Sequence, residues 1–169
     1  MDKIPMKPDS QLIRALKSIP WFFDLDDTQL ARLASIGKIW EFDQGDVLID
    51  EGIGRPDLVI ILTGSASIET RLPIQSFVKV GTAEALDLLG WTGMTPIYHD
   101  MIVRAVGLEE GRALLFNSSM LSDLCRKDHQ IGYIVLNRVA NDMARRFLEM
   151  QIFMSNVIIQ KSWNRSLDM

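Results

Sequence analysis

Between residues 38 and 116 the sequence is a succession of short β-type runs, and glycine separates one run from the next. The runs read IWEFDQGDVLIDEG, DLVIILTGSASIET, SFVKVG, MIVRAV and RALLFN. Strands at this density, with glycine at the turns, are typical of an all-β roll or sandwich. We therefore expect a mainly β fold in this part of the chain.

Two of these runs predict different degrees of burial. Residues 58–62 have no polar alternate, so we expect both faces of this strand to be buried. In the next run Ser65, Ser67 and Glu69 alternate with apolar residues, which is the pattern of a half-exposed strand. The sequence thus separates a central strand from one at the rim.

Two helices are predicted before the β-type runs. Apolar residues at spacings of three and four follow Ser10 and predict a short helix that ends at Pro20. Asp26 and Gln29 have the spacing of a capping box at the start of a second helix, and Gly37 ends it.

Helical spacing returns after Asn117. Ser118 and Ser119 can cap a short helix, and Asp128 can cap a long one that continues to about Ser155. A helix of about 28 residues would be about 42 Å long, which is longer than a small β-roll. We therefore expect a homodimer or a larger protein partner to contact its surplus apolar residues, namely Leu136, Met143, Phe147, Met150 and Met154.

These patterns predict one domain and a short tail. The domain spans residues 10–155, with N-terminal helices in 10–37, a β-roll in 38–117 and C-terminal helices in 118–155. Residues 156–169 are predicted to form a C-terminal tail. The expected fold class is mainly β with α.

Composition excludes several classes of partner. The net charge of −4 and the pI near 5.2 provide no basic field for nucleic acid. No apolar stretch approaches the roughly 18 to 20 residues of a membrane span, and the N-terminus lacks the apolar core of a signal peptide. We therefore expect a cytoplasmic protein that binds neither nucleic acid nor membrane. The single cysteine, Cys125, is expected to be a packing residue.

The order of helices, β-roll and helices resembles the cyclic nucleotide-binding domain of the Crp/Fnr class. Residues 16–52, including the Gly45-Asp46 and Glu51-Gly52 turns, are similar to its opening helices and first strands, and LVIILTGSASI is similar to its central strands. CRKDHQIGYIVLNRVANDMARRF resembles its last two helices. The resemblance covers about residues 12–155 and implies a jelly roll flanked by N-terminal helices and a long C-terminal helix.

Regulators of this class continue into a winged helix-turn-helix domain. Here only VIIQKSWNRSLDM follows Asn156, so we expect a stand-alone domain without DNA recognition.

The segment LLGWTGMTPIYHDMIVRAV resembles the phosphate-binding cassette of this family. In the family a glycine precedes a glutamate that binds the ribose 2′-hydroxyl, and an arginine downstream pairs with the cyclic phosphate. Alignment on the following strand puts Trp91 at the glutamate position and His99 at the arginine position. An indole cannot accept a hydrogen bond, and a largely neutral histidine lacks the fork of arginine. We therefore expect no cofactor, and weak or no binding of cAMP and cGMP.

The divergent cassette still predicts a candidate ligand site. Its glycines permit close approach of backbone, and a short helix near Thr92 would present N–H groups to a small anionic ligand. Trp91 either stacks on a ligand or fills the vacated volume, and we favour the second. Tyr98 and His99 either line a polar pocket or lie on the surface, and Arg104 either points inward or forms a salt bridge at the rim. The candidate ligand-binding residues are Gly90, Trp91, Thr92, Gly93, Tyr98, His99 and Arg104.

Catalysis is not indicated. A metal-dependent cupin is also a β-roll, but it needs clustered histidines, and the only two here are His99 and His129. We find no Ser-His-Asp arrangement, Walker loop or CxxC motif. Two functions remain open: a regulatory module that senses a ligand in a modified pocket and signals through its last helix, or a ligand-free adaptor that uses the fold for assembly.

Overall fold

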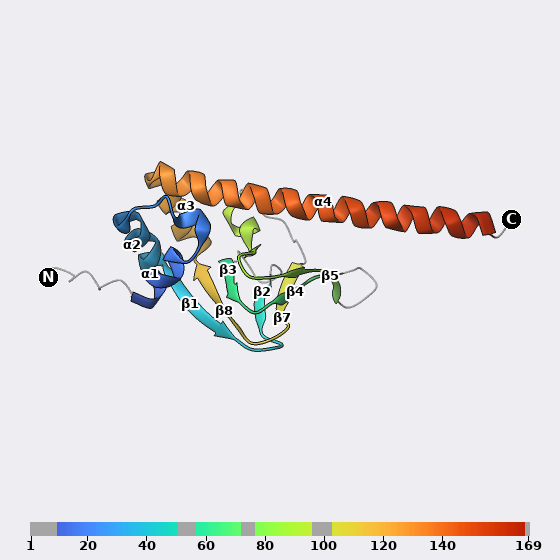
Figure 1. Ribbon diagram of the computed structural model, residues 1–169, viewed down its shortest axis with the longest axis horizontal. Helices are drawn as coiled ribbons and strands as arrows, with labels where there is room; N and C mark the ends of the chain where they lie inside the picture. The colour runs from blue at the N-terminus through green and yellow to red at the C-terminus, as the bar shows by residue number, and fades with distance from the viewer. Residues whose placement is uncertain (1–9, 51–56, 72–76, 96–102, 168–169) are drawn as a thin grey trace. The chain divides into compact units, whose positions relative to one another are not determined.

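The computed structural model describes residues 10–50, 57–71, 77–95 and 103–167, and helices precede and follow a set of short strands along the chain (Figure 1). The helices are α1 (Ser10–Lys17), α2 (Asp27–Ile36), α3 (Ser118–Lys127) and α4 (His129–Leu167), with 3-10 turns η1 (Pro20–Phe22) and η3 (Trp91–Met94). The strands are β1 (Gly37–Phe42), β2 (Val47–Asp50), β3 (Leu58–Thr63), β4 (Ala66–Arg71), β5 (Phe77–Ala83), β6 (Leu88–Leu89), β7 (Val103–Gly107) and β8 (Gly111–Phe116).

The described strands form two four-stranded sheets, and their pairings are antiparallel. One sheet has the order β1-β8-β3-β6 and the other has the order β2-β7-β4-β5. Buried apolar side chains from all eight strands meet in one cluster between the sheets. The arrangement is the jelly roll that the sequence predicted.

The predicted burial of the two central runs is confirmed for one and partly wrong for the other. Residues 58–61 of β3 are all buried, as expected for a strand covered on both faces, whereas Leu62 at the end of the predicted run is only partly buried. In β4, however, Ser67 is also buried. Its hydroxyl donates to the Val106 carbonyl at 3.3 Å and to a Glu69 carboxylate oxygen at 3.0 Å. A serine whose hydroxyl is hydrogen-bonded can be buried at low cost, so alternation alone misjudged it.

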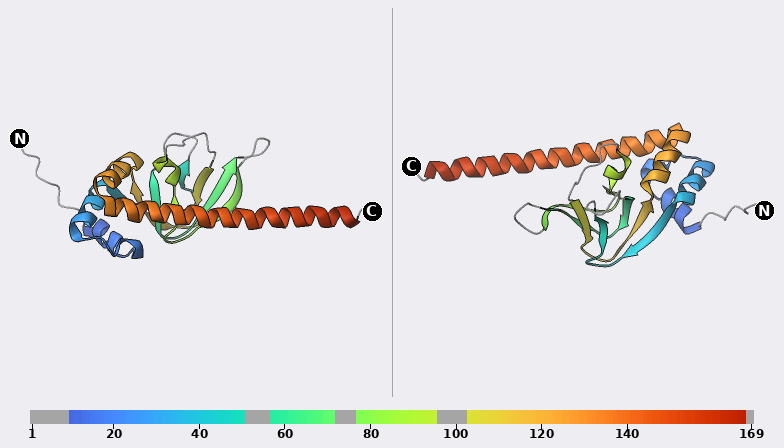
Figure 2. Two further views of the ribbon diagram at one scale, coloured as in Figure 1. Left: turned by 90° about the horizontal axis from the view of Figure 1, so that it is seen from above. Right: turned by 180° about the vertical axis from the view of Figure 1, so that it is seen from behind.

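Helices α1, α2 and α3 gather at one end of the strands (Figures 1 and 2). The predicted capping box is present, because the Gln29 N–H donates to Asp26 at 2.8 Å and the Asp26 N–H donates to the Gln29 side chain at 3.1 Å. Gly37 follows α2 as predicted. The cap of α3 is Asn117, which accepts from the Met120 N–H, and neither predicted serine takes this place.

Helix α4 begins as predicted but ends later. The Asp128 carboxylate accepts from the Ile131 N–H at 3.2 Å, and so caps the helix. The helix then runs for 39 residues to Leu167, so the predicted end near Ser155 is wrong and residues 156–167 are helical. No glycine or proline follows Gly132 in this helix, and without such a residue no local signal stops it.

The chain divides into two compact units, Met1–Val135 and Leu136–Met169, and the boundary lies within α4. In the first unit, α3 and the first turn of α4 approach closely at Gly132. A Cβ atom at Gly132 would lie 2.7 Å from the Cys125 carbonyl oxygen.

Burial raises the pKa of the Cys125 thiol to about 11, which keeps it protonated and fits the predicted packing role. Among the described helices, none has the length and apolarity that crossing a membrane would require.

Candidate functional site

The first four candidate residues form the turn that follows β6. Gly90 precedes η3, and Trp91, Thr92 and Gly93 lie within it. Tyr98 and His99 fall outside the described residues, so their two alternatives stay predictions. Arg104 is the second residue of β7. The structure therefore describes one compact part of the candidate site and one residue on a separate strand.

Gly90 is required by packing within the roll. Its φ of 70° lies in the left-handed region, and a Cβ atom there would lie 2.0 Å from the Asp57 carbonyl oxygen. Both observations favour glycine at this position. The close approach that the sequence indicated is thus made by the protein's own backbone.

The short helix expected near Thr92 is present as the single turn η3. Within it the Gly93 N–H donates to the Gly90 carbonyl at 3.0 Å, and the Thr95 N–H donates to the Thr92 carbonyl at 3.1 Å. The Thr95 hydroxyl donates to the same carbonyl at 2.9 Å. The turn therefore uses these donors to hold its own shape.

Trp91 is partly buried, between the left-handed Gly90 and the buried Thr92. Partial burial fits a ring that fills part of a vacated volume, and it equally fits a ring that a ligand could contact. The preference for Trp91 as a filler of that volume stays a prediction.

Arg104 forms an ion pair within the sheet. Its Nε donates to a Glu69 carboxylate oxygen at 2.6 Å, and its guanidinium carbon lies 3.7 Å from the centre of the Phe77 ring. Glu69 and Arg104 are register partners on β4 and β7. The neighbours of Arg104 in sequence, Val103 and Ala105, pack in the core cluster, so the guanidinium lies on the opposite face of the sheet. The salt-bridge alternative for Arg104 is confirmed.

The opposite charges of Glu69 and Arg104 balance each other within the sheet. The hydrogen bond from the Arg104 guanidinium is the main reason why the pKa of Glu69 lies below its usual range, while desolvation opposes the shift and the Ser67 hydroxyl adds to it. Glu69 thus remains a carboxylate at neutral pH and offsets the charge of Arg104. This geometry gives Arg104 a partner without any anionic ligand.

Among the described residues, a buried apolar cluster lies between the two sheets. The buried core cluster consists of aliphatic side chains, alanines and one phenylalanine, and Trp40 and Val103 pack against it. A polar ligand placed among these side chains would lose its hydrogen bonds to water without replacement. Among the described residues no three His, Cys, Asp or Glu side chains gather as a metal site would require.

Comparisons with known proteins extend this picture. No protein-family model matches the sequence, and no curated protein does. Solved structures do match. A cyclic nucleotide-binding domain from Methylobacillus flagellatus KT has a TM-score of 0.66 at 19% identity, and the match covers 82% of this chain and 78% of that chain. The sensor domain of the transcriptional regulator DNR from Pseudomonas aeruginosa has a TM-score of 0.63 at 13% identity, over 79% of this chain and 89% of that one.

The chain has the cyclic nucleotide-binding domain fold of the Crp/Fnr type. The same fold occurs in the regulatory subunit of a cAMP-independent protein kinase A from Trypanosoma brucei, with a TM-score of 0.61 at 22% identity. That match covers 83% of this chain and 50% of the kinase subunit. The resemblance drawn from the sequence is therefore confirmed for the fold.

Beyond this cyclic nucleotide-binding fold, α4 carries a row of exposed apolar side chains. The five predicted interface residues have exposed fractions between 40% for Met143 and 55% for Phe147. We call these five residues, Leu136, Met143, Phe147, Met150 and Met154, the α4 seam. Four further exposed apolar or aromatic residues of α4, which are Tyr133, Leu148, Ile152 and Ile159, were not predicted from the sequence. At 100° per residue Leu148, Ile152 and Ile159 lie on another face of the helix, and a plot of helical angle could have found them.

The neighbouring residues Arg145 and Arg146 form ion pairs within α4. Arg145 and Arg146 donate to the two oxygens of Asp142 at 2.7 and 2.8 Å, and Arg145 also donates to Glu149 at 3.2 Å. The arginines are spaced three and four residues from the aspartate, which is the spacing that allows such pairs. Their charges are thus largely balanced within α4.

Proposed function

We propose that this chain is a non-catalytic regulatory module with a modified ligand pocket, and that it acts through α4. The observation that carries the proposal is the α4 seam, a regular row of exposed apolar side chains on the helix that ends the described fold. A soluble chain exposes such a row when another surface covers it in the functional assembly. The named roles of the structural neighbours, a sensor domain and a kinase regulatory subunit, support a regulatory role.

The proposed occupant of the α4 seam is a second copy of this chain. With the exposed Ala140, the seam residues recur at alternating spacings of four and three from Leu136 to Met154. Alternation of this kind keeps one stripe facing a partner helix, as in a coiled coil. Burial of the stripe would contribute roughly 25 cal/mol per Å² before the costs of association.

Two neighbouring residues allow a sharp test of the dimer. Phe147 lies in the seam and Leu148 does not, yet their exposed fractions are 55% and 58%. In sedimentation experiments we expect a dimer for the parent and for Leu148→Asp, and a monomer for Phe147→Asp. A monodisperse parent monomer would remove the proposal. Equal dissociation of the two variants would place the contact on another face of α4.

The proposed pocket does not bind cAMP or cGMP in the family's manner. Trp91 stands where a carboxylate would accept the ribose hydroxyl, and Arg104 is already paired with Glu69. A regulatory subunit with this fold is named cAMP-independent, which supports regulation of such a fold by other means. Calorimetry with each nucleotide tests the statement, and a micromolar dissociation constant, about −8 kcal/mol, would contradict it.

The alternative is a ligand-free adaptor, and two observations favour it. The described residues form a buried apolar cluster between the sheets, and the Gly93 and Thr95 N–H groups donate to carbonyls of the η3 turn itself. Mass spectrometry of small molecules released from the purified and denatured protein distinguishes the two functions. A stoichiometric small anion supports the sensor, and a protein that releases none but still forms the dimer supports the adaptor.

A further inference from the structure

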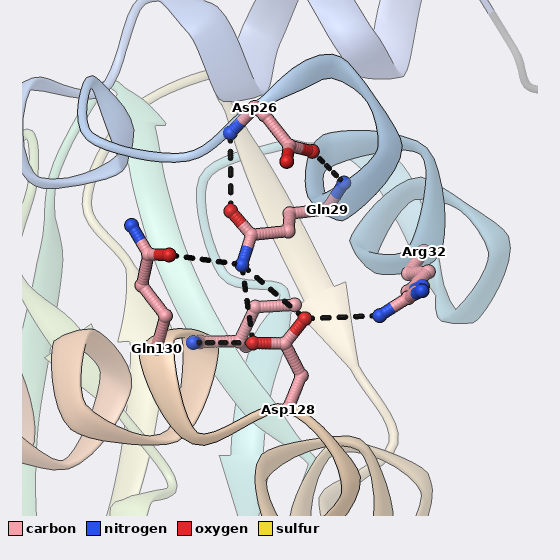
Figure 3. Close-up of polar contacts among 6 residues, drawn as sticks. Asp26, Gln29, Arg32, Asp128 and Gln130 are labelled. Atoms are coloured by element: carbon pink, nitrogen blue, oxygen red, sulfur yellow. Dashed lines mark hydrogen bonds and ion pairs between the residues drawn. The ribbon is translucent and has the colours of Figure 1, made fainter.

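A polar cluster joins α2 to the start of α4, although its two sides are about a hundred residues apart in sequence (Figure 3). The cluster consists of Asp26, Gln29 and Arg32 from the α2 side, and Asp128 and Gln130 from the α4 side. All five residues belong to the first compact unit. Nothing in the proposed function uses them.

Gln29 is the central residue of the cluster. Its side-chain oxygen accepts from the Asp26 N–H at 3.1 Å, which completes the capping box of α2. Its amide nitrogen faces the two Asp128 oxygens at 3.1 and 3.2 Å and the Gln130 oxygen at 3.3 Å. Since a carboxylate only accepts hydrogen bonds, these partners fix which way the amide points. One buried side chain therefore takes part in both the cap of α2 and the contact with α4.

Asp128 has the corresponding double role on the other side. One of its oxygens accepts from the Ile131 N–H at 3.2 Å and so caps α4, while the other accepts from Arg32 at 3.0 Å. Desolvation acts to raise the pKa of Asp128, but the hydrogen bonds from Ile131 and Gln29 and the charge of Arg32 outweigh it, so that the pKa is lowered. The carboxylate is thus charged at neutral pH and held from both helices.

A second connection runs through Gln130. Its amide donates to the Asp24 carbonyl at 2.7 Å, in the segment just before α2, while its oxygen faces Gln29. The first turn of α4 therefore contacts both α2 and the segment that precedes α2. A displacement of α2 that breaks these contacts would also remove partners from the residue that caps α4.

We propose that this polar cluster couples α2 to the start of α4, so that a partner or ligand that moves either helix changes the stability of the other. Coupling of this kind is reciprocal, because a shared set of contacts is lost or kept by both helices together. The five residues of the cluster lie in the first compact unit, and this coupling does not require a ligand at the cassette.

Two substitutions break the cluster while each preserves the local cap. Gln29→Glu keeps the capping box, since glutamate suits this position, but it puts a second carboxylate beside Asp128. Asp128→Asn keeps an oxygen for the Ile131 N–H, since asparagine is a good N-cap, but it removes the charge that Arg32 and Gln29 contact. In the double variant the side chain at position 128 has an amide that can donate, and the side chain at position 29 has a carboxylate that can accept. The hydrogen bond between the two positions can therefore form again with its direction reversed. Ser35→Ala, on the exposed side of α2, is the control.

Hydrogen–deuterium exchange measures both helices in each variant of the full chain. In each single variant we expect roughly tenfold faster exchange in α2 and also in the first turn of α4, as for loss of a hydrogen bond to a charged group. The double variant should return most of the protection in both helices, and Ser35→Ala should match the parent.

The coupling would be overturned if each single substitution changed only its own helix, or if the effects of the two substitutions simply added. Asp128→Asn is the decisive variant if Gln29→Glu does not fold, because it retains the cap of α4. Unchanged exchange in α2 of Asp128→Asn would then refute the proposal.

Discussion

Gly132 in α4 provides a test in which helix propensity and packing predict opposite signs. Replacing a glycine by alanine inside a helix ordinarily stabilises it by about 1 kcal/mol. Here the added methyl group would lie 2.7 Å from the Cys125 carbonyl oxygen, and the next nearest atoms are also backbone atoms of that residue. Neither side can yield by rotating a side chain. Overpacking of this kind costs about 1–3 kcal/mol or more.

We therefore expect Gly132→Ala to lower the free energy of unfolding by about 1–2 kcal/mol, since the packing cost exceeds the propensity gain. For a chain of this length the melting temperature should fall by roughly 2–8 °C. Urea unfolding followed by circular dichroism measures the change. Asn141→Ala, at an exposed site in the same helix, is the control and should be neutral or slightly stabilising.

A further variant identifies the atom responsible. If the clash is with the Cys125 carbonyl, adding Cys125→Ala cannot relieve it, because the backbone is unchanged. A Gly132→Ala protein as stable as the parent, or one rescued by Cys125→Ala, would refute the geometry given for the α3–α4 contact.

Three other predictions follow from single residues. Leu86 has a φ of 71°, so Leu86→Gly should be more stable than Leu86→Ala by roughly 0.5–1 kcal/mol in urea unfolding, because only glycine avoids the left-handed strain; an equal or less stable glycine variant would contradict this. Because the folded-state pKa of Asp128 is lowered, its contribution is present above its unfolded pKa and is lost as the pH falls through the folded value. The stability deficit of Asp128→Asn should therefore be largest near pH 7 and should shrink below about pH 4, and a deficit independent of pH would argue against a charged Asp128. Trp91→Ala should cost less than the roughly 3–5 kcal/mol of a fully buried tryptophan, yet at least about 1 kcal/mol if the ring fills part of the pocket, and a variant as stable as the parent would favour a ligand or partner contact.

The parts of the fold that could be predicted from sequence are those with local physical causes. Gly45 and Gly64 adopt positive φ at the turns where glycine was expected, and Asp26 with Gln29 forms the expected capping box. Glycine permits the positive φ of its own residue, and the capping box satisfies N–H groups within three residues. Such features can be recognised from the local sequence, because no distant partner is involved.

The features that were not predicted have one of two causes. Either several neighbouring residues could play the same role, or the partner residue is far away in sequence. Asn117, Ser118 and Ser119 are all good N-cap residues. The local sequence does not distinguish them, so it could not show that α3 begins after Asn117. Ser67 could be buried because Val106, which is 39 residues away, accepts its hydroxyl. Gln29 was recognised as a capping residue, but its contact with Asp128 spans 99 residues and leaves no local pattern.

The two proposals meet in α4, and reciprocity allows them to be tested against each other. The helix is continuous from the cap at Asp128 through the α4 seam, and no glycine or proline interrupts it after Gly132. If pairing of the seam and the polar cluster belong to one regulatory device, loss of pairing must be felt at α2, because coupling acts in both directions. We therefore expect faster exchange of α2 amides in the Phe147→Asp monomer than in the parent dimer, with Leu148→Asp as the matched control. Identical α2 exchange in all three proteins would show that the polar cluster anchors α4 without carrying any signal from the seam.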